Sequence, residues 1–246
     1  TLLREYPALE DNLSSLSSTF PTLPPEKILA GLEKMTAEDY PAIPSETECT
    51  VKYVDKALEP YSAPAFYMIP PIDNTKDNTI YINRMDTAEG LSLFTTMAHE
   101  GYPGHLYQTV YSGYYIHSTG ANPLRSLLSC GGYIEGWATY AELNSYDYAI
   151  RLTKEKHPET EVLYLADKLN RQIQLSLYSM LDIIIHYEGA SYDRVREILS
   201  AIGISDEESI RAVYEYIIGE PCNYLKYYLG YLEIEALKER AEVLWS

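Results

Sequence analysis

The sequence has few basic residues and no long apolar run. Nineteen Lys and Arg stand against 36 Asp and Glu in 246 residues, which gives a formal net charge of −17. Nucleic acids and anionic lipids require a basic face, so this balance argues against both as partners and leaves cations as acceptable ligands. No apolar run reaches about 18 residues, the length that a membrane-spanning helix requires. The sequence therefore predicts no membrane-spanning segment.

Cysteine is also scarce, with Cys49, Cys130 and Cys222 and no Cys-x-x-Cys pair. A cysteine zinc site and a disulfide framework are both disfavoured by this odd, unpaired set. Phe and Trp number 3 and 2, whereas Tyr numbers 25. Most aromatic side chains therefore carry a hydroxyl that needs a hydrogen-bond partner or water.

The chain nevertheless has the composition of a globular protein, with 46% hydrophobic and 22% charged residues. Residues 1–45 form an amphipathic lead-in with six prolines. Within it, Pro24-Pro25-Glu26 followed by ILAGLEKM predicts a short helix with proline in its first turn. We therefore expect a helical, proline-rich lead-in over residues 1–45 and a main region over residues 46–246.

Strands are expected only in the first third of the chain. Residues 47–56 alternate in polarity, and residues 78–84 (NTIYINR) are rich in β-forming residues between turn residues. Residues 60–75 contain four prolines and are expected to be irregular or extended.

From about Thr87 onward the apolar residues follow a helical period. Two of the later helices have a Ser at the start and a Gly at the end, Ser191 with Gly203 and Ser205 with Gly219. The fold class is therefore mainly α, with a small β-sheet in the first third. The expected helices cover residues 88–100, 131–149, 158–187 (one long helix or two), 191–203, 205–219 and 223–246.

Residues 96–108, TMAHEGYPGHLYQ, contain two histidines near a glutamate. The familiar zinc signature on a helix has two His four residues apart, which share a face. His99 and His105 are six residues apart, about 600° at 100° per residue, so an unbroken helix would point them about 120° apart. However, Pro103 between Gly101 and Gly104 must distort this helix, and a break there could return both imidazoles to one face. The plain alternative is two unrelated histidines beside a kink.

A catalytic zinc site needs a third protein ligand and an open position for water. Glu135 offers a third ligand in the otherwise apolar stretch YIEGWATYAEL, on an expected helix thirty residues after His105. Glu142 lies seven residues on, on nearly the same face, and could accept a hydrogen bond from a ligand. The alternative is that Glu135 is simply exposed beside Trp137. With zinc bound, Glu100 would act as general base, while a Tyr or His side chain would donate a hydrogen bond to the oxyanion.

Six segments resemble one known family in their order: SAPAFYMIPP, IYINR, HEGYPGHLYQ, YIEGWATYAEL, LDIIIHYEG and EPCNYLKYYLGYLEI. They resemble the bacterial domain-of-unknown-function 885 family over about residues 50–240. That family is similar to the helical, gluzincin-like zinc peptidases grouped around angiotensin-converting enzyme, thimet oligopeptidase and carboxypeptidase Taq. The resemblance implies a helical zincin-like catalytic half that cleaves peptides with one Zn²⁺.

The resemblance also assigns roles to residues. It implies zinc ligands at His99, His105 and Glu135, a base at Glu100, an oxyanion donor at Tyr227 and a cleft-lining His186. His186 also has an ordinary explanation, a core histidine held by Asp182. Residues 78–84 are expected to form an edge strand to which a peptide could add. Substrate-binding residues implied in this way are Tyr81, Asn83 and Tyr224.

Two features depart from the family pattern. Members are usually about twice this length, so residues 46–246 would be the C-terminal half of a longer protein whose N-terminal half is missing. The fragment could then be inactive alone. Many members also carry a second His directly after the position of His105, where this chain has Leu106.

The leading hypothesis is thus a zinc-dependent metallopeptidase-like hydrolase that cleaves peptide bonds with metal-activated water. Two alternatives stay open: a non-catalytic helical module that binds peptides at a vestigial site, and a zinc amidohydrolase acting on a non-peptide amide. Unpaired cysteines weakly favour a reducing compartment, whereas relatives are often exported, so a cytoplasmic and an exported location both stay open.

Overall fold

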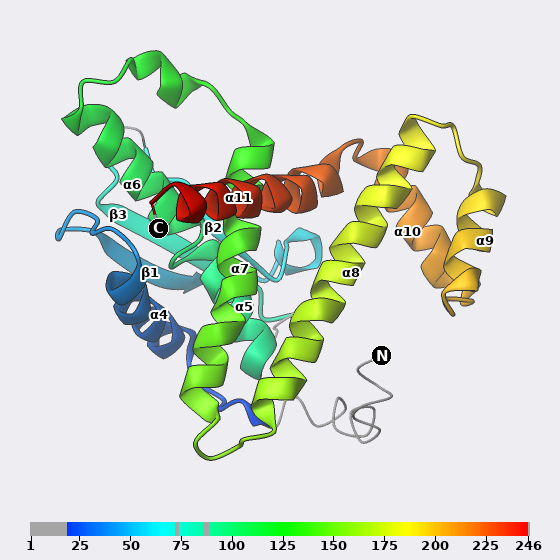
Figure 1. Ribbon diagram of the computed structural model, residues 1–246, viewed down its shortest axis with the longest axis horizontal. Coiled ribbons are helices and arrows are strands. Elements are labelled where there is room, and N and C mark those ends of the chain that lie inside the picture. Colours follow the sequence, from blue (N-terminus) through cyan, green and yellow to red (C-terminus); the bar gives the residue numbers. More distant parts are fainter. Residues whose placement is uncertain (1–18, 72–73, 86–88, 246) are drawn as a thin grey trace. The chain divides into compact units, whose positions relative to one another are not determined.

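The computed structural model describes residues 19–71, 74–85 and 89–245 (Figure 1). Within these ranges the chain is mainly helical, with a small three-stranded sheet in the N-terminal third, as the sequence predicts. The strands are β1 (Glu48–Tyr53), β2 (Ala65–Met68) and β3 (Asp77–Ile82). The helices are α4 (Pro25–Asp39), α5 (Gly90–Glu100), α6 (His105–Ser118), α7 (Gly131–Thr153), α8 (Thr160–His186), α9 (Tyr192–Ala201), α10 (Glu207–Gly219) and α11 (Asn223–Trp245), with short 3₁₀ turns η1 (Glu59–Tyr61) and η2 (Pro123–Leu127).

The chain divides into two compact units, described separately below. Among the described residues, the first unit comprises those from 19 to 130 and from 137 to 168, and the second those from 131 to 136 and from 169 to 245. The first 18 residues of the expected lead-in lie outside the described residues. Its helix, α4, begins at Pro25 as predicted and packs against β1 and α5, so it belongs to the first unit.

The sheet has the strand order β1-β3-β2, which corrects one expectation from the sequence. β3 pairs with β1 in parallel and with β2 antiparallel. Residues 78–84 were expected to supply an edge strand, but β3 lies in the centre of the sheet. One face of β3 is also covered, because Asn78, Ile80 and Ile82 are all buried. The edge strands of this sheet are β1 and β2.

Strand β2 was not predicted, because it lies inside the proline-rich segment 60–75. Only five residues, AFYMI, separate Pro64 from the prolines at 70 and 71, and so short a run gives little periodicity. Pairing with β3 makes it a strand: the backbone N–H of Asn83 donates to Pro64 O at 2.9 Å and starts the ladder. Pairing with β3, rather than the local sequence, therefore makes residues 65–68 a strand.

The first unit has an aromatic and aliphatic core beneath the sheet. Helix α5 contacts both β2 and α4. Phe20 packs against Phe94 of α5 with ring centroids 5.0 Å apart, and against Tyr164 at 6.3 Å. Eight of the eleven residues of α5 are buried, including His99 near its end. A histidine in such a helix is therefore held in place by packing on nearly every side.

The later helices largely follow their predicted limits. The segment 158–187 forms one long helix, α8, rather than two. Ser191 caps α9 through its side chain, which accepts from the N–H of Arg194, as the sequence predicts. For α10 the cap is Asp206 rather than Ser205: its carboxylate accepts from the N–H of Ser209 at 2.8 Å. A carboxylate is favoured there because it also meets the positive end of the helix dipole.

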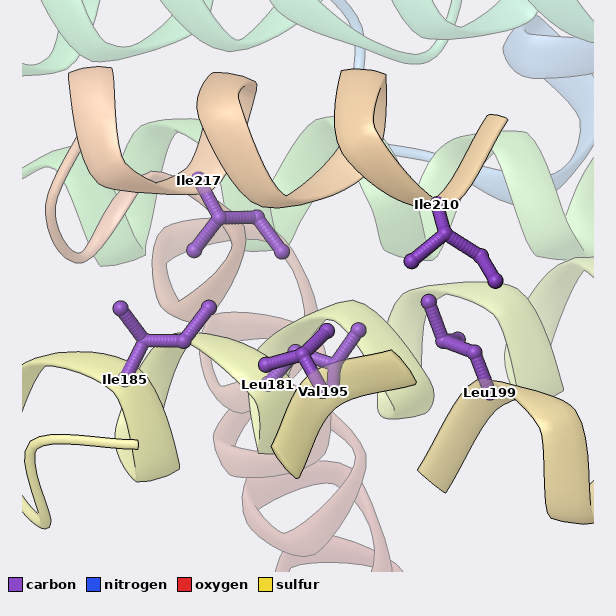
Figure 2. Packing of buried hydrophobic residues seen from close by; sticks show 6 residues of the cluster. All are labelled: Leu181, Ile185, Val195, Leu199, Ile210 and Ile217. Atoms are coloured by element: carbon purple, nitrogen blue, oxygen red, sulfur yellow. The ribbon is translucent and has the colours of Figure 1, made fainter. Parts of the chain in front are cut away.

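Three helices of the second unit share one apolar core. Leu181 and Ile185 of α8, Val195 and Leu199 of α9, and Ile210 and Ile217 of α10 point toward one another in Figure 2. All six are at most 8% exposed. Burial of side chains of this size stabilises a fold by about 1.5–3 kcal/mol each. The core therefore fixes the C-terminal end of α8, where Asp182 and His186 lie.

The loop before α11 contains a strained residue. Cys222 has φ of 65°, in the left-handed region that favours glycine. Its N–H donates to the carboxylate of Asp182 at 3.0 Å, which holds the backbone in this conformation. The left-handed conformation costs an L-residue about 1–2 kcal/mol relative to glycine. Replacement by glycine would recover only about half of this free energy, because glycine also makes the unfolded chain more flexible.

We therefore expect Cys222→Gly to be more stable to urea than Cys222→Ala by about 0.5–1 kcal/mol. Both variants remove the thiol, and only the glycine relieves the backbone. Equal unfolding free energies for the two, or a more stable alanine variant, would contradict the strained conformation.

Candidate metal centre

The helix that carries the two histidines is broken where the sequence predicts. Helix α5 ends at Glu100 and α6 begins at His105, with Gly101–Gly104 between them and a cis Tyr102–Pro103 peptide bond. Only glycine fits at position 104, because a Cβ there would lie 1.9 Å from the carbonyl oxygen of His99. The expected break in the helix between the two histidines is therefore confirmed.

The break brings the two imidazoles together. The ring centroids of His99 and His105 are 4.8 Å apart, with the ring planes at 85°. Glu135, in the second turn of the continuous helix α7, joins them: one ligand atom from each of the three residues lies within 4.8 Å of the other two. Two imidazoles and a carboxylate are a donor set typical of catalytic zinc.

Glu142 orients His99, as the sequence suggested. Both side chains are buried, and Nδ1 of His99 donates to Oε2 of Glu142 at 3.0 Å. In this tautomer Nε2 carries the lone pair, which is the form in which an imidazole binds a metal ion through Nε2. A carboxylate behind a histidine ligand also fixes the ring and raises its basicity.

Glu100 faces strand β2. The backbone N–H of Tyr67 donates to Oε2 of Glu100 at 2.8 Å. Tyr67 is itself anchored, since its hydroxyl donates to Asn78 Oδ1 at 2.7 Å and burial raises the pKa of this phenol. Sequence reasoning missed this contact because it joins residues 33 positions apart and involves a backbone group, which leaves no side-chain signal.

Glu135 is followed by a glycine at which α7 and α11 cross closely. Both helical segments belong to the second unit. A Cβ on Gly136 would lie 2.3 Å from the carbonyl carbon of Gly230, and a Cβ on Gly230 would lie 2.1 Å from the carbonyl oxygen of Gly132. The helices touch backbone to backbone, so no larger side chain fits. This contact fixes the turn of α7 that carries Glu135.

His186 lies at the end of α8 and is held by Asp182. Its Nδ1 donates to Oδ1 of Asp182 at 2.8 Å, and the same oxygen accepts from the N–H of Cys222. Asp182 is 1% exposed, whereas the His186 side chain is 26% exposed. The ordinary explanation of this histidine, an imidazole held by Asp182, thus describes its contacts. The imidazole of His186 is nevertheless partly exposed.

Tyr224 and Tyr227 lie in the first turns of α11. The ring of Tyr224 packs against Tyr178 at 4.7 Å and Tyr216 at 5.8 Å, and burial raises the pKa of its hydroxyl to about 12. Tyr224 is thus part of an aromatic cluster within the second unit. Tyr227 is half-buried one turn further along the helix.

Tyr81 of β3 and Asn83, which directly follows β3, were both implied in substrate binding but have different surroundings. Asn83 is 1% exposed, and its side-chain amide donates to the carbonyl oxygens of Glu59 and Ser62 at 2.8 and 2.9 Å. Its Oδ1 accepts from the N–H of Met85, so the side chain ties down neighbouring loops rather than facing a ligand. Tyr81 is partly exposed and stacks on Phe66 of β2 at 5.3 Å.

Comparison with known proteins places the chain in a family. A family model described as "Bacterial protein of unknown function (DUF885)" matches residues 26–244, nearly the whole chain. The chain belongs to this family. No curated protein matches it.

This DUF885 protein also shares its fold with a solved structure, the putative lipoprotein from Colwellia psychrerythraea. The TM-score is 0.70 and the sequence identity 22%, over 95% of this chain. The match covers 37% of the Colwellia protein, so this chain spans little more than a third of that protein's length. At this identity the likeness shows the fold alone.

Among the helices of the described residues, none has both the length and the apolar character needed to cross a bilayer.

Proposed function

We propose that this DUF885 protein binds one zinc ion through His99, His105 and Glu135. We propose further that it is part of a zinc-dependent hydrolase that cleaves peptide bonds. The observation that carries the proposal is the convergence of the three ligand atoms within 4.8 Å of one another. The sequence resemblance to helical zinc peptidases supports the same choice of metal and reaction.

The spacing of the donor atoms supports zinc. Zn–N and Zn–O bonds are about 2.0–2.2 Å long, so two ligands of one tetrahedral ion lie about 3.4 Å apart. Donor atoms that lie up to 4.8 Å apart would therefore approach one another by up to about 1.4 Å when the ion binds. Glu142 already presents His99 in the tautomer that a metal requires. A zinc ion held here would supply Lewis acidity, polarising a carbonyl group and lowering the pKa of water.

The remaining polar groups have roles that follow from their chemistry. Glu100 neighbours His99 and would accept a proton from the attacking water and pass it to the leaving amine. The N–H of Tyr67 keeps the Glu100 carboxylate in place for this transfer. In our proposal Tyr227 donates a hydrogen bond to the developing oxyanion, and His186 lines the substrate cleft.

A peptide substrate would pair with the edge of β2 rather than with β3. β3 is central, whereas β2 is an edge strand, and the N–H of its Tyr67 points away from β3 toward Glu100. A strand added along this edge would run beside the base. We therefore retain peptide binding at the sheet, transfer it to β2, and no longer assign Asn83 to the substrate.

We further propose that the chain is the catalytic part of a longer protein whose other part completes the cleft. The small share of the Colwellia protein that it matches supports this view. Hydrolysis is therefore best measured on the full-length protein, whereas metal binding can be measured on either.

Elemental analysis and a substrate panel test the proposed function. Protein purified without chelators is expected to contain one zinc per chain, and anomalous scattering at the zinc edge should give one peak among His99, His105 and Glu135. Peptides should be hydrolysed in preference to non-peptide amides. A full-length protein that neither contains nor takes up zinc would refute the proposal. Peptide binding without hydrolysis, or hydrolysis of non-peptide amides alone, would each replace it with another function.

A further inference from the structure

We infer that Trp137 is a positioning residue of the candidate metal centre, because its indole N–H fixes the backbone segment that joins the two histidines. The inference rests on the proposed function for its metal and adds a residue that the proposed reaction does not use. Trp137 and the helix break both lie in the first unit.

The helix break leaves the Pro103 carbonyl outside the hydrogen-bond pattern of α6. In a continuous helix the N–H of Tyr107 would donate to Pro103 O, four residues earlier. Instead, it donates to Gly101 O at 3.3 Å, and the next N–H, of Gln108, donates to Gly104 O. The Pro103 carbonyl accepts from Nε1 of Trp137 at 2.8 Å. Trp137 thus replaces the donor that the break removes.

The indole ring is held on several sides, so the direction of its N–H is fixed. Trp137 stacks on Tyr107, with ring planes at 16°, and meets Tyr40 edge to face at 6.1 Å. Tyr140, one turn along α7, packs against it at 5.7 Å. Burial raises the pKa of the Tyr40 hydroxyl and that of Tyr107, the latter to about 12, so both rings stay neutral.

A fixed indole fixes the spacing of the ligands. Pro103 lies four residues after His99 and two before His105, in the segment whose path decides the 4.8 Å separation of the two rings. Glu135 precedes Trp137 by two residues on α7. One short stretch of α7 therefore supplies the third ligand and also holds the segment between the first two. Loss of the indole N–H should therefore weaken metal binding without unfolding the protein.

The test compares Trp137→Phe with Tyr107→Phe. The first variant keeps an aromatic ring and removes the N–H that reaches Pro103 O. The second removes a hydroxyl from the same aromatic cluster, one that donates to the carbonyl of Pro41 at 2.8 Å, away from the break. Both lose one hydrogen bond to a backbone carbonyl. Only the first loses a bond to the segment between the histidines.

We expect Trp137→Phe to raise the dissociation constant for zinc about 10- to 100-fold, the range found for groups that orient metal ligands. Competition with a chelator measures this constant. The visible spectrum of the Co²⁺-substituted protein should change with it, since the spectrum reports ligand geometry. Tyr107→Phe should bind zinc within about threefold of wild type and keep the Co²⁺ spectrum. Its unfolding free energy should nevertheless fall by about as much as that of Trp137→Phe, because each variant loses one hydrogen bond.

A second measurement needs no variant, because the chain has only two tryptophans. The indole N–H of Trp137 should exchange with deuterium at least about tenfold more slowly than that of Trp245, which is 86% exposed. In NMR spectra, addition of zinc should change the chemical shift of the Trp137 indole N–H and leave that of the Trp245 indole N–H unchanged.

The possible results distinguish the role of Trp137 from the proposed zinc site itself. Equal zinc affinities of Trp137→Phe and wild type would overturn the inference and leave the proposed function intact. Equal weakening by both variants would assign the effect to the stability of the aromatic cluster, and rapid exchange of the Trp137 indole would remove the hydrogen bond itself. A wild-type protein that binds no zinc would overturn the proposed function as well.

Discussion

Glu100→Gln is expected to retain zinc and to lower peptide hydrolysis by about 10²–10⁴-fold, the usual contribution of a general base. Glutamine has the size of glutamate, and its side-chain oxygen can still accept from the N–H of Tyr67. It cannot take a proton from water at neutral pH, so the variant removes the proton transfer alone. Turnover by the full-length protein and zinc content by elemental analysis are the two measurements.

Two further variants make this result specific. His99→Ala removes a ligand and should lose both zinc and activity. His117→Ala changes an exposed histidine of α6, whose Nδ1 donates to the carbonyl of Gly113, and should lose neither. Full activity of Glu100→Gln would exclude Glu100 as the base. Loss of zinc in this variant would instead make Glu100 part of the metal site.

Gly136→Ala is expected to destabilise the protein by about 1–3 kcal/mol and to weaken zinc binding at the same time. The new Cβ would meet Gly230 at 2.3 Å from its carbonyl carbon and 2.6 Å from its Cα. Backbone atoms cannot rotate away as a side chain does, so α7 and α11 must separate. Glu135 is the adjacent residue, and the shift of this turn carries its carboxylate away from the histidines.

Gly132→Ala is a matched control one turn earlier on α7. A Cβ at this position meets no atom within 4 Å. Because alanine favours a helix over glycine, this variant should be as stable as wild type or more stable by up to about 1 kcal/mol, with unchanged zinc affinity. Urea unfolding and chelator competition on both variants provide the comparison. If the two alanines behave alike, the close crossing does not position Glu135.

Much of the candidate site could be predicted because its geometry is local. The steric rules for Pro103 and its flanking glycines act within a few residues and require a break wherever this sequence occurs. The same holds for the proline that opens α4 and the Ser191 cap of α9. The choice of Asp206 over Ser205 was not predictable in this way, since either side chain can cap a helix.

Contacts between distant residues could be anticipated only in part. The acceptor role of Glu142 was inferred from its spacing to Glu135 on one helix, yet its partner, His99, is 43 residues away. Trp137 was visible as part of a motif, but nothing in the sequence connects its indole to Pro103, 34 residues earlier. Strand order was likewise hidden: β3 has the composition of a strand, but composition does not say whether one neighbour or two will pair with it.

The sequence by itself determined the family, the mainly helical class and a break between two histidines, because these depend on patterns and on the conformational limits of proline and glycine. Tertiary structure alone decided that β2 is an edge strand, that Tyr67 holds Glu100, and that Trp137 holds the break. These features arise from packing and hydrogen bonding between segments far apart in the chain, where a backbone carbonyl or N–H accepts whichever partner the fold brings to it.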